Sequence, residues 1–232
     1  MTQVTQLGTR RTSVDEIFDH LHGEILSLRM RPGDKISEAE VAAQFGVSRQ
    51  PVRDAFSRLA NLDLLLIRPQ RATEVRRFST REIMKARFIR AAVEKEVLRR
   101  AALNCDAQGA ALLDASLEVQ EATIRDKDVD GFGALDYKFH ETICQIAKAD
   151  FAFEVIMTEK SKVDRLCLLS LSKGNRIPEL VEDHRAIAEA IKNRDPDAAV
   201  ELGVRHLSRL DETIEEIFDT NASYFEAEDV RT

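Results

Sequence analysis

The sequence predicts a mainly α-helical protein, with an N-terminal winged helix-turn-helix followed by a C-terminal all-helical antiparallel bundle. Three observations support this fold class. Long stretches rich in Ala, Leu, Glu and Arg contain few of the nine Gly and five Pro residues, which favours helices. Apolar residues recur at helical spacing through most of the chain. Strand-forming residues around a turn, 64–76, interrupt this spacing within the first third of the sequence.

The composition indicates a soluble, cytoplasmic protein that does not contact membranes. No apolar run approaches the roughly 18 residues that span a bilayer, and the polar start of the chain lacks the apolar core of a signal peptide. The three cysteines, Cys105, Cys144 and Cys167, are odd in number and widely spaced. This argues against a disulfide framework or a cysteine-based zinc site. We expect reduced, mostly buried thiols.

Charge is distributed unevenly along the chain. The net charge of −7 argues at first sight against a polyanionic partner. Residues 1–79, however, contain 12 Lys and Arg against 10 Asp and Glu, whereas residues 80–232 contain 22 against 31. Within residues 47–77 the numbers are seven and three. A local basic surface suited to nucleic acid therefore remains in an acidic protein.

Three helices are expected in the first part of the chain, each introduced by a Ser that can act as N-cap. The capping positions are, in order, Ser13 with Glu16, Ser37 with Glu40, and Ser48. Residues 31–34 end the first helix, Gly46 ends the second, and the third spans 49–61. The apolar residues of this third helix are expected to face the core: Val52, Ala55, Phe56 and Leu59.

A hairpin follows the third helix directly. Residues 64–68 and 73–76 are predicted as its two strands, with a turn between them. Helix, helix-turn-helix and hairpin together make a winged helix-turn-helix domain at residues 13–78. The polar segment 1–12 shows no periodicity and is expected to be a disordered lead-in.

The rest of the chain is predicted to form six antiparallel helices. Apolar spacing and helix breakers place them at 80–104, 107–127, 131–148, 151–173, 177–193 and 196–221. Asp195 and Pro196 provide the N-cap and the first residue of the last helix. We therefore expect a C-terminal domain at 79–222 and a tail at 223–232.

The third helix carries a candidate DNA-reading surface. In a helix-turn-helix, the N-terminal residues of the recognition helix contact base edges in the major groove. Arg49 and Arg53 are four residues apart, so they share a face from which each could make bidentate bonds to guanine. Gln50 could pair with adenine or hold a phosphate, and Ser48 could contact a phosphate.

Two more arginines belong to this expected surface. Arg58 lies on the same helix, and Arg71 at the hairpin tip could reach the DNA backbone or the minor groove. The alternative is that Arg49, Arg53 and Arg58 are ordinary surface arginines, solvated or paired with Asp54. Spacing alone supports both interpretations equally.

Two gap-free stretches make a specific comparison possible: ILSLRMRPGDKISE at 25–38 and VAAQFGVSRQPVRDAFSRL at 41–59. They resemble the GntR-type transcriptional regulators, and the resemblance extends over residues 17–75. It implies operator binding as a dimer, with Arg49 and Arg53 as the main readers of bases and phosphates.

The chain departs from the GntR pattern at two positions where that family usually has Gly. Asp63 follows the recognition helix, and Ala72 lies at the wing tip. Ala adopts positive φ less readily than Gly, so we expect a reshaped turn that holds its backbone further from DNA.

A candidate metal site is formed by four residues of the C-terminal part. His140, His184 and His206 lie in three different predicted helices, and Asp136 is four residues before His140 on the same helix face. Three imidazoles and a carboxylate suit a divalent ion, Zn first, with Ni, Mn or Fe as alternatives, and leave coordination positions for an effector carboxylate. The alternative is four unrelated polar residues.

Four short stretches bear on this choice: RAAVE at 90–94, DYKFH at 136–140, EDHRAI at 182–187 and RHL at 205–207. They resemble the all-helical FCD-type domain of the FadR branch of GntR-type regulators in its metal-binding form, over roughly residues 80–220. Six helices would resemble the VanR-like subgroup. The resemblance implies that Asp136, His140, His184 and His206 bind metal.

Arg90 is the expected effector-binding residue. It shares a helical stripe with Ile83 and Val97, so its guanidinium can project into the bundle and clamp a carboxylate or a sugar-acid group. Similar domains place an Arg there. The alternative is an ion pair with Glu94, four residues further along the helix.

These observations predict a homodimeric transcriptional regulator, not an enzyme, whose repression a small carboxylate or sugar acid relieves. A metal-dependent enzyme acting on a small carboxylate is the alternative. It needs a general base, and only Glu141 and Asp183 adjoin the ligands in sequence, both on helix faces expected to turn away from the ligand. A purely structural metal and a metal sensor are further alternatives.

Overall fold

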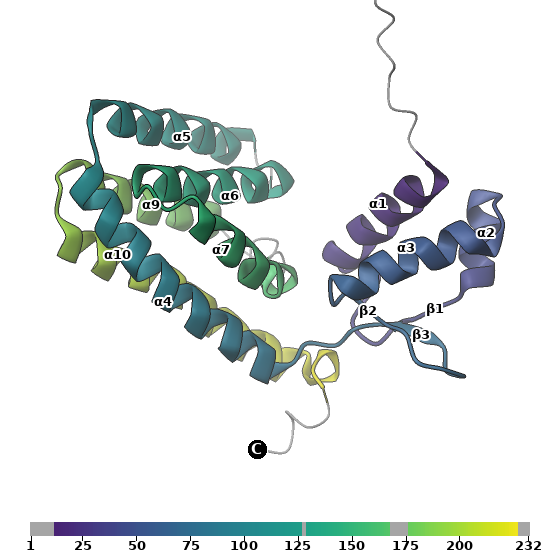
Figure 1. Cartoon of the computed structure of the whole chain (residues 1–232). Coiled ribbons are helices and arrows are strands. Elements are labelled where there is room, and N and C mark those ends of the chain that lie inside the picture. The colour runs from purple at the N-terminus through teal and green to yellow at the C-terminus, as the bar shows by residue number, and fades with distance from the viewer. Residues whose placement is uncertain (1–11, 127–128, 168–175, 227–232) are drawn as a thin grey trace, which may run out of the picture. The chain divides into compact units, whose positions relative to one another are not determined.

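The computed structural model describes residues 12–126, 129–167 and 176–226 of the 232-residue chain. The fold divides into two compact units between Arg77 and Phe78. In Figure 1 the colour runs along the chain from purple in the first unit to yellow at the end of the second. The predicted lead-in, except residue 12, and the last six residues of the predicted tail lie outside the described residues.

The N-terminal unit is a winged helix-turn-helix, as the sequence predicted (Figure 1). Its elements are α1 (Ser13–Leu26), β1 (Lys35–Ile36), α2 (Glu38–Phe45), α3 (Arg49–Asn61), β2 (Leu65–Leu66) and β3 (Thr73–Val75). The strands form an antiparallel sheet in the order β1-β3-β2, with Ile36 opposite Thr73 and Leu65 opposite Val75. The sequence analysis did not predict β1, since two residues are too short to show an alternating pattern.

The three helices begin where the sequence placed them, but their caps differ in detail. The capping box of α1 uses Thr12 and Asp15 rather than Ser13 and Glu16. Ser37 caps α2 by accepting a hydrogen bond from the Glu40 backbone N–H. Ser48 is at the N-cap position of α3, yet its side chain makes no capping hydrogen bond.

One apolar face from each helix fills the core of this unit. Ile17, Leu21 and Ile25 of α1 are fully buried. They pack in one cluster with the predicted inward face of α3, Val52, Ala55, Phe56 and Leu59. Burying this face of α3 turns its opposite, polar face to solvent, which is the face that carries Arg49.

The two departures from the GntR glycine pattern differ in their backbone. Asp63, directly after α3, adopts a left-handed conformation with φ of 57°, which Asp tolerates better than most residues. Its carboxylate pairs with Arg76. In the turn between β2 and β3, Gln70 takes the positive φ of 58°, and Ala72 does not. The turn therefore needs no Gly at Ala72.

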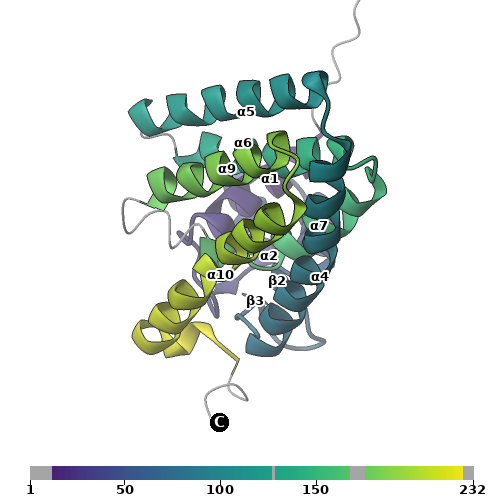
Figure 2. The ribbon, with the colours of Figure 1, turned by 90° about the vertical axis from the view of Figure 1, so that its left-hand side faces the viewer.

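The C-terminal unit is an all-helical bundle, also as predicted. Its elements are α4 (Thr80–Asn104), α5 (Ala107–Asp126), α6 (Val129–Ile146), α7 (Phe151–Ser161), α9 (Arg176–Lys192), α10 (Pro196–Thr220) and the short η1 (Ala222–Tyr224). Figures 1 and 2 show α4 beside α10 and α5 along α6 and α9. Asp195 caps α10, accepting a hydrogen bond from the backbone of Ala198.

The predicted helix at 151–173 is interrupted. The α7 helix ends at Ser161, a turn follows at Lys162 and Val163, and helical conformation resumes at 164–167. Residues 168–173 lie outside the described residues. The apolar pattern does not reveal this break, because Val163 and Leu166, three residues apart, keep helical spacing and are both fully buried.

The cysteines are placed as the sequence predicted. Cys105 and Cys144 are buried and Cys167 is half-buried, all as free thiols. Burial raises the pKa of Cys144 to about 12, so this thiol is unreactive near neutral pH. Among the described helices, none has both the length and the apolar character needed to cross a membrane.

The first residues of the predicted tail pack against the start of the bundle. Phe225 is 2% exposed and lies 5.5 Å from Phe78 and 4.9 Å from Phe218, measured between ring centroids. The Phe78 backbone N–H donates to the Tyr224 carbonyl, and the Glu226 N–H donates to the Phe78 carbonyl. This segment therefore belongs to the folded C-terminal unit.

Phe225→Ala is predicted to lower the free energy of unfolding by about 3 kcal/mol, because it leaves a cavity in a packed aromatic cluster. Urea denaturation followed by circular dichroism measures this change. Phe151→Ala is the matched control, since Phe151 is 74% exposed and its loss should change stability by less than about 0.5 kcal/mol. Equal losses in the two variants would show that residues 222–226 do not stabilise the fold.

Candidate metal centre and nucleic-acid interface

The N-terminal end of α3 presents a polar surface. Ser48, Arg49, Gln50 and Arg53 are all exposed. Arg53 Nε donates to Glu38 at 2.9 Å, a pair between α3 and α2. Gln50 Nε2 donates to Asp54, also at 2.9 Å. Exposed pairs of this kind are weak, so both side chains can exchange these partners for phosphate or base contacts.

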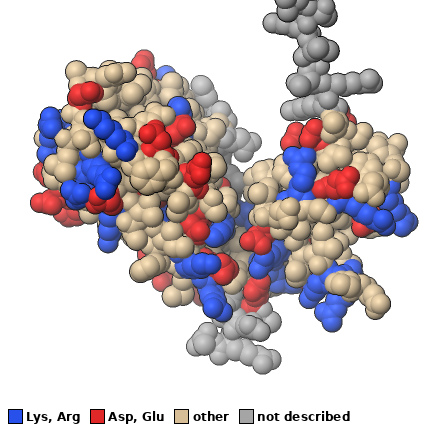
Figure 3. Space-filling view, in the orientation of Figure 1, with Lys and Arg blue, Asp and Glu red and all other residues tan. Residues whose placement is uncertain are grey.

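Arg58 lies apart from this group. Its guanidinium pairs with Asp15 at 2.8 Å and lies 4.1 Å above the ring of Phe18, so it connects α3 to α1. Arg71 is exposed in the turn between β2 and β3. Figure 3 shows Lys and Arg side chains around this hairpin end of the N-terminal unit.

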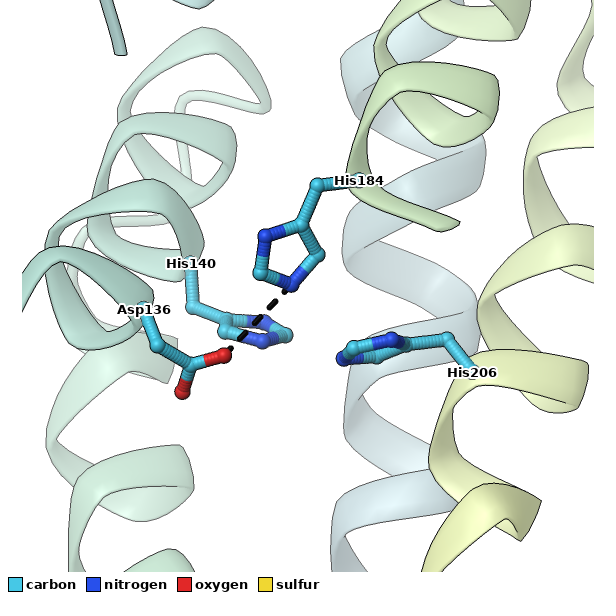
Figure 4. A group of neighbouring side chains, drawn as sticks. All are labelled: Asp136, His140, His184 and His206. Carbon is cyan, nitrogen blue, oxygen red and sulfur yellow. Dashed lines mark ion pairs between the residues drawn. The ribbon is translucent and has the colours of Figure 1, made fainter. Parts of the chain in front are cut away.

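The C-terminal unit brings together the four predicted metal ligands. Asp136 and His140 come from α6, His184 from α9 and His206 from α10, and all four point toward one centre (Figure 4). One ligand atom of each lies within 4.8 Å of those of the others. All four residues are buried. Residues up to 70 positions apart in sequence are thus brought together with the residue types and spacing of a metal-coordinating group.

The chemistry of this group fits a divalent metal ion. Among the described residues, no hydrogen-bond partner faces Nε2 of His140 or Nε2 of His184, although both atoms are buried and need one. The Asp136 Oδ1 atom lies 3.4 Å from His184 Nε2. Burial and the nearby His206 lower the pKa of His184 well below its usual value. His184 is therefore neutral, the form that binds metals.

An oxygen atom faces Nδ1 of each histidine. Glu94 Oε2 of α4 lies 3.0 Å from His140 Nδ1, and Gln120 Oε1 of α5 lies 2.6 Å from His184 Nδ1. These oxygens accept, so the two Nδ1 atoms carry the proton and the Nε2 lone pairs face the centre. For the third histidine, Asp183 Oδ2 lies 3.5 Å from His206 Nδ1.

Each carboxylate at the site also faces a cation. Arg90 donates to Glu94 at 2.8 Å, Lys160 of α7 lies 3.2 Å from Asp136, and Arg209 of α10 binds both oxygens of Asp183 at 2.9 and 3.0 Å. These contacts are side-chain ion pairs. Burial alone would raise the pKa of Glu94, but Arg90 and His140 lower it to about 2. Lys160 and the histidines likewise keep the pKa of Asp136 far below its usual value.

The sequence analysis missed several residues of this site. It placed Asp183 on a helix face turned away from the ligands; instead Asp183 is 3% exposed and faces His206 on the neighbouring helix. Gln120 and Lys160 were not predicted as part of the site, although each continues an apolar helix face. Gln120 follows Leu113 and Leu117 on α5, and Lys160 follows Ala152 and Ile156 on α7. A polar residue at such a position is a detectable signal.

The structure gives Arg90 the ion pair that the sequence analysis considered as its alternative role. Arg90 is 7% exposed, as expected of a side chain projecting into the bundle, and its Nε donates to Glu94. Because Glu94 in turn faces His140, Arg90 orients a ligand through one intermediate residue. Direct contact between Arg90 and an effector stays a prediction.

Comparison with known proteins gives the same division of the chain. Residues 13–75 match the bacterial regulatory proteins of the gntR family, and residues 85–209 match the FCD domain. The HTH-type transcriptional repressor RspR of Escherichia coli K12 is 35% identical over 98% of this chain and 100% of that protein. The probable D-xylose utilization operon transcriptional repressor of Paenarthrobacter nicotinovorans is 29% identical, covering 86% and 88%.

Among solved structures, Escherichia coli McbR/YncC superimposes with a TM-score of 0.68 at 18% identity, covering 89% of this chain and 99% of that one. At this identity the likeness establishes the fold alone. The family matches and the similarity to RspR extend over both units and include the recognition helix and the bundle helices. The chain belongs to the GntR family of bacterial transcriptional regulators, with an FCD domain as its C-terminal part.

Proposed function

We propose that this protein is a homodimeric repressor whose operator binding is weakened by a small organic acid bound at a metal site in the FCD domain. The observation that carries the proposal is the buried group of Asp136, His140, His184 and His206, with two Nε2 atoms that lack hydrogen-bond partners among the described residues. The relatives RspR and the D-xylose regulator are both named as repressors.

The exposed end of α3 supports operator recognition by Ser48, Arg49, Gln50 and Arg53. In a dimer, two such helices would read two half-sites about one turn of DNA apart. Arg71 on the wing would contact the DNA backbone or minor groove. Arg58 can reach DNA only when its pair with Asp15 opens.

The electrostatics of the site support an anionic effector. Each carboxylate at the site already has a cationic partner: Asp136 faces Lys160, Glu94 faces Arg90, and Asp183 faces Arg209. These carboxylates would therefore neutralise the positive charge of a bound divalent ion only in part. When bound, such an ion, with zinc as the first candidate, supplies open coordination positions for a carboxylate. Arg90 of α4 would bind the carboxylate of the same acid when its ion pair with Glu94 opens.

The alternative of a metal-dependent enzyme has no support from the comparisons. The relatives that match along both units are transcriptional regulators, and the family is one of regulators. Asp183, which could have acted as a general base, is committed to Arg209 and faces His206. We therefore assign the site to sensing rather than to turnover.

Arg49→Ala is predicted to weaken binding to operator DNA about 5- to 150-fold, the equivalent of one lost bidentate base contact of about 1–3 kcal/mol. Fluorescence anisotropy with a fragment from upstream of the protein's own gene measures it. Arg99→Ala on α4 removes the same charge from an exposed position of the other unit and should leave affinity unchanged. Equal effects would contradict recognition by α3.

His184→Ala is predicted to abolish stoichiometric binding of zinc, because it removes a ligand from the centre of the buried group. Inductively coupled plasma mass spectrometry gives the metal content. In wild type, zinc at about 100 times its Kd should stabilise the protein by about 2.7 kcal/mol, and chelation should reverse this. The control His20→Ala changes an exposed histidine and should retain zinc; stoichiometric zinc in His184→Ala would refute the assignment.

Asp183→Asn is predicted to weaken zinc binding about 10- to 100-fold while preserving shape, because the oriented partner of His206 loses its charge. Competition with a chromogenic chelator measures the affinity. Glu141→Gln is the matched control, since Glu141 also adjoins a ligand in sequence but pairs with Lys138. If both variants bound zinc as wild type does, the role given to Asp183 would be wrong.

A further inference from the structure

A narrow cavity lies beside two of the four candidate ligands, enclosed by the helices of the bundle. Its polar side chains cluster at one end: Glu94 lies 3.0 Å from His140, and the rings of His140 and His206 are 5.7 Å apart. The remaining lining residues are Val97, Leu98, Ile143, Ile156, Ile187 and Gly203. The free space is enough for about one water molecule. A larger occupant must therefore displace part of this lining.

The lining offers little to a polyhydroxylated molecule. Its polar side chains are confined to one end, and there Glu94 already accepts from Arg90 and faces His140 Nδ1. Apart from these polar residues and Gly203, all five lining residues are aliphatic. A hydroxyl group placed among them would lose its hydrogen bonds to water without replacement, whereas a methylene group would gain by leaving water.

We propose that this cavity takes the hydrocarbon end of the effector, so that the effector is a compact aliphatic monocarboxylate and not a sugar acid. This inference rests on the proposed function, because the carboxylate end would lie at the site of Asp136 and the three histidines. His140 and His206 belong to both the ligand group and the cavity lining, so one molecule can reach both.

Leu98 and Gly203 set the length of chain that the cavity accepts. They lie on α4 and α10, and the side chain of Leu98 covers the backbone of Gly203 so closely that a Cβ at Gly203 would collide with Leu98 Cδ1. That atom is the end of a flexible side chain, so Leu98 can turn. A longer hydrocarbon chain has to push Leu98 aside, and with it the contact between α4 and α10.

Isothermal titration calorimetry of the zinc-loaded, full-length protein tests this inference, using acetate, propionate, butyrate, pentanoate and gluconate. Because the lining must move aside for anything larger than a water molecule, we expect affinity to rise by at most roughly fourfold for each added methylene until Leu98 can turn no further, and we expect gluconate to bind more weakly than butyrate. A preference for gluconate, or affinities that do not depend on chain length, would overturn the proposal.

Two substitutions should shift the preferred length in opposite directions. Leu98→Ala enlarges the cavity and should move the tightest binding to a longer acid. Gly203→Ala pushes Leu98 into the cavity and should favour a shorter acid. Leu113→Ala, an equally buried leucine of α5 that does not line the cavity, is the control and should leave the order of affinities unchanged. An unchanged order in all three variants would also overturn the proposal.

The outcomes separate this inference from the proposed function. If zinc does not bind, or if acids bind equally well without zinc, the proposed metal-centred sensor fails and this inference fails with it. If zinc binds and gluconate is the preferred zinc-dependent ligand, the sensor stands and only the aliphatic specificity is wrong.

Discussion

Three imidazoles and one carboxylate meet in the interior of the FCD domain, and the rest of the bundle is arranged around that meeting point. Buried Nε2 atoms without a partner destabilise a fold, and within the part of the chain that the structure describes, two of the atoms in this group, on His140 and His184, lack one. A divalent ion would satisfy both. The candidate ligands come from α6, α9 and α10.

The other described bundle helices hold these ligands in place. The α4 helix supplies Glu94 to His140, α5 supplies Gln120 to His184, and α7 supplies Lys160 to Asp136. Each of the described helices α4 to α7, α9 and α10 therefore contributes a polar group to one site. A change in the ligation of the centre would act on all of these helices together, and α4 continues directly from the segment that ends the DNA-binding unit.

The sequence predicted the parts of this structure that depend on local periodicity. The start and end of α4 and the inward face of α3 with Phe56 were predicted correctly, and the four candidate ligands come together as expected. Contacts between helices could not be predicted in this way. Asp183 faces His206 because α9 and α10 are antiparallel neighbours, and no spacing within α9 indicates this. The packing of Phe225 and the short β1 likewise depend on tertiary partners.

We expect the acid and the operator to bind to different states of the same molecule. Such coupling is reciprocal, so the operator must weaken binding of the acid by the same factor by which the acid weakens binding of the operator. The most direct measurement is the calorimetric affinity of zinc-loaded protein for butyrate with and without a saturating operator fragment. We expect weaker binding of butyrate in the presence of operator; equal affinities in the two conditions would contradict coupling between the two sites, because a ligand with equal affinity for both states shifts neither.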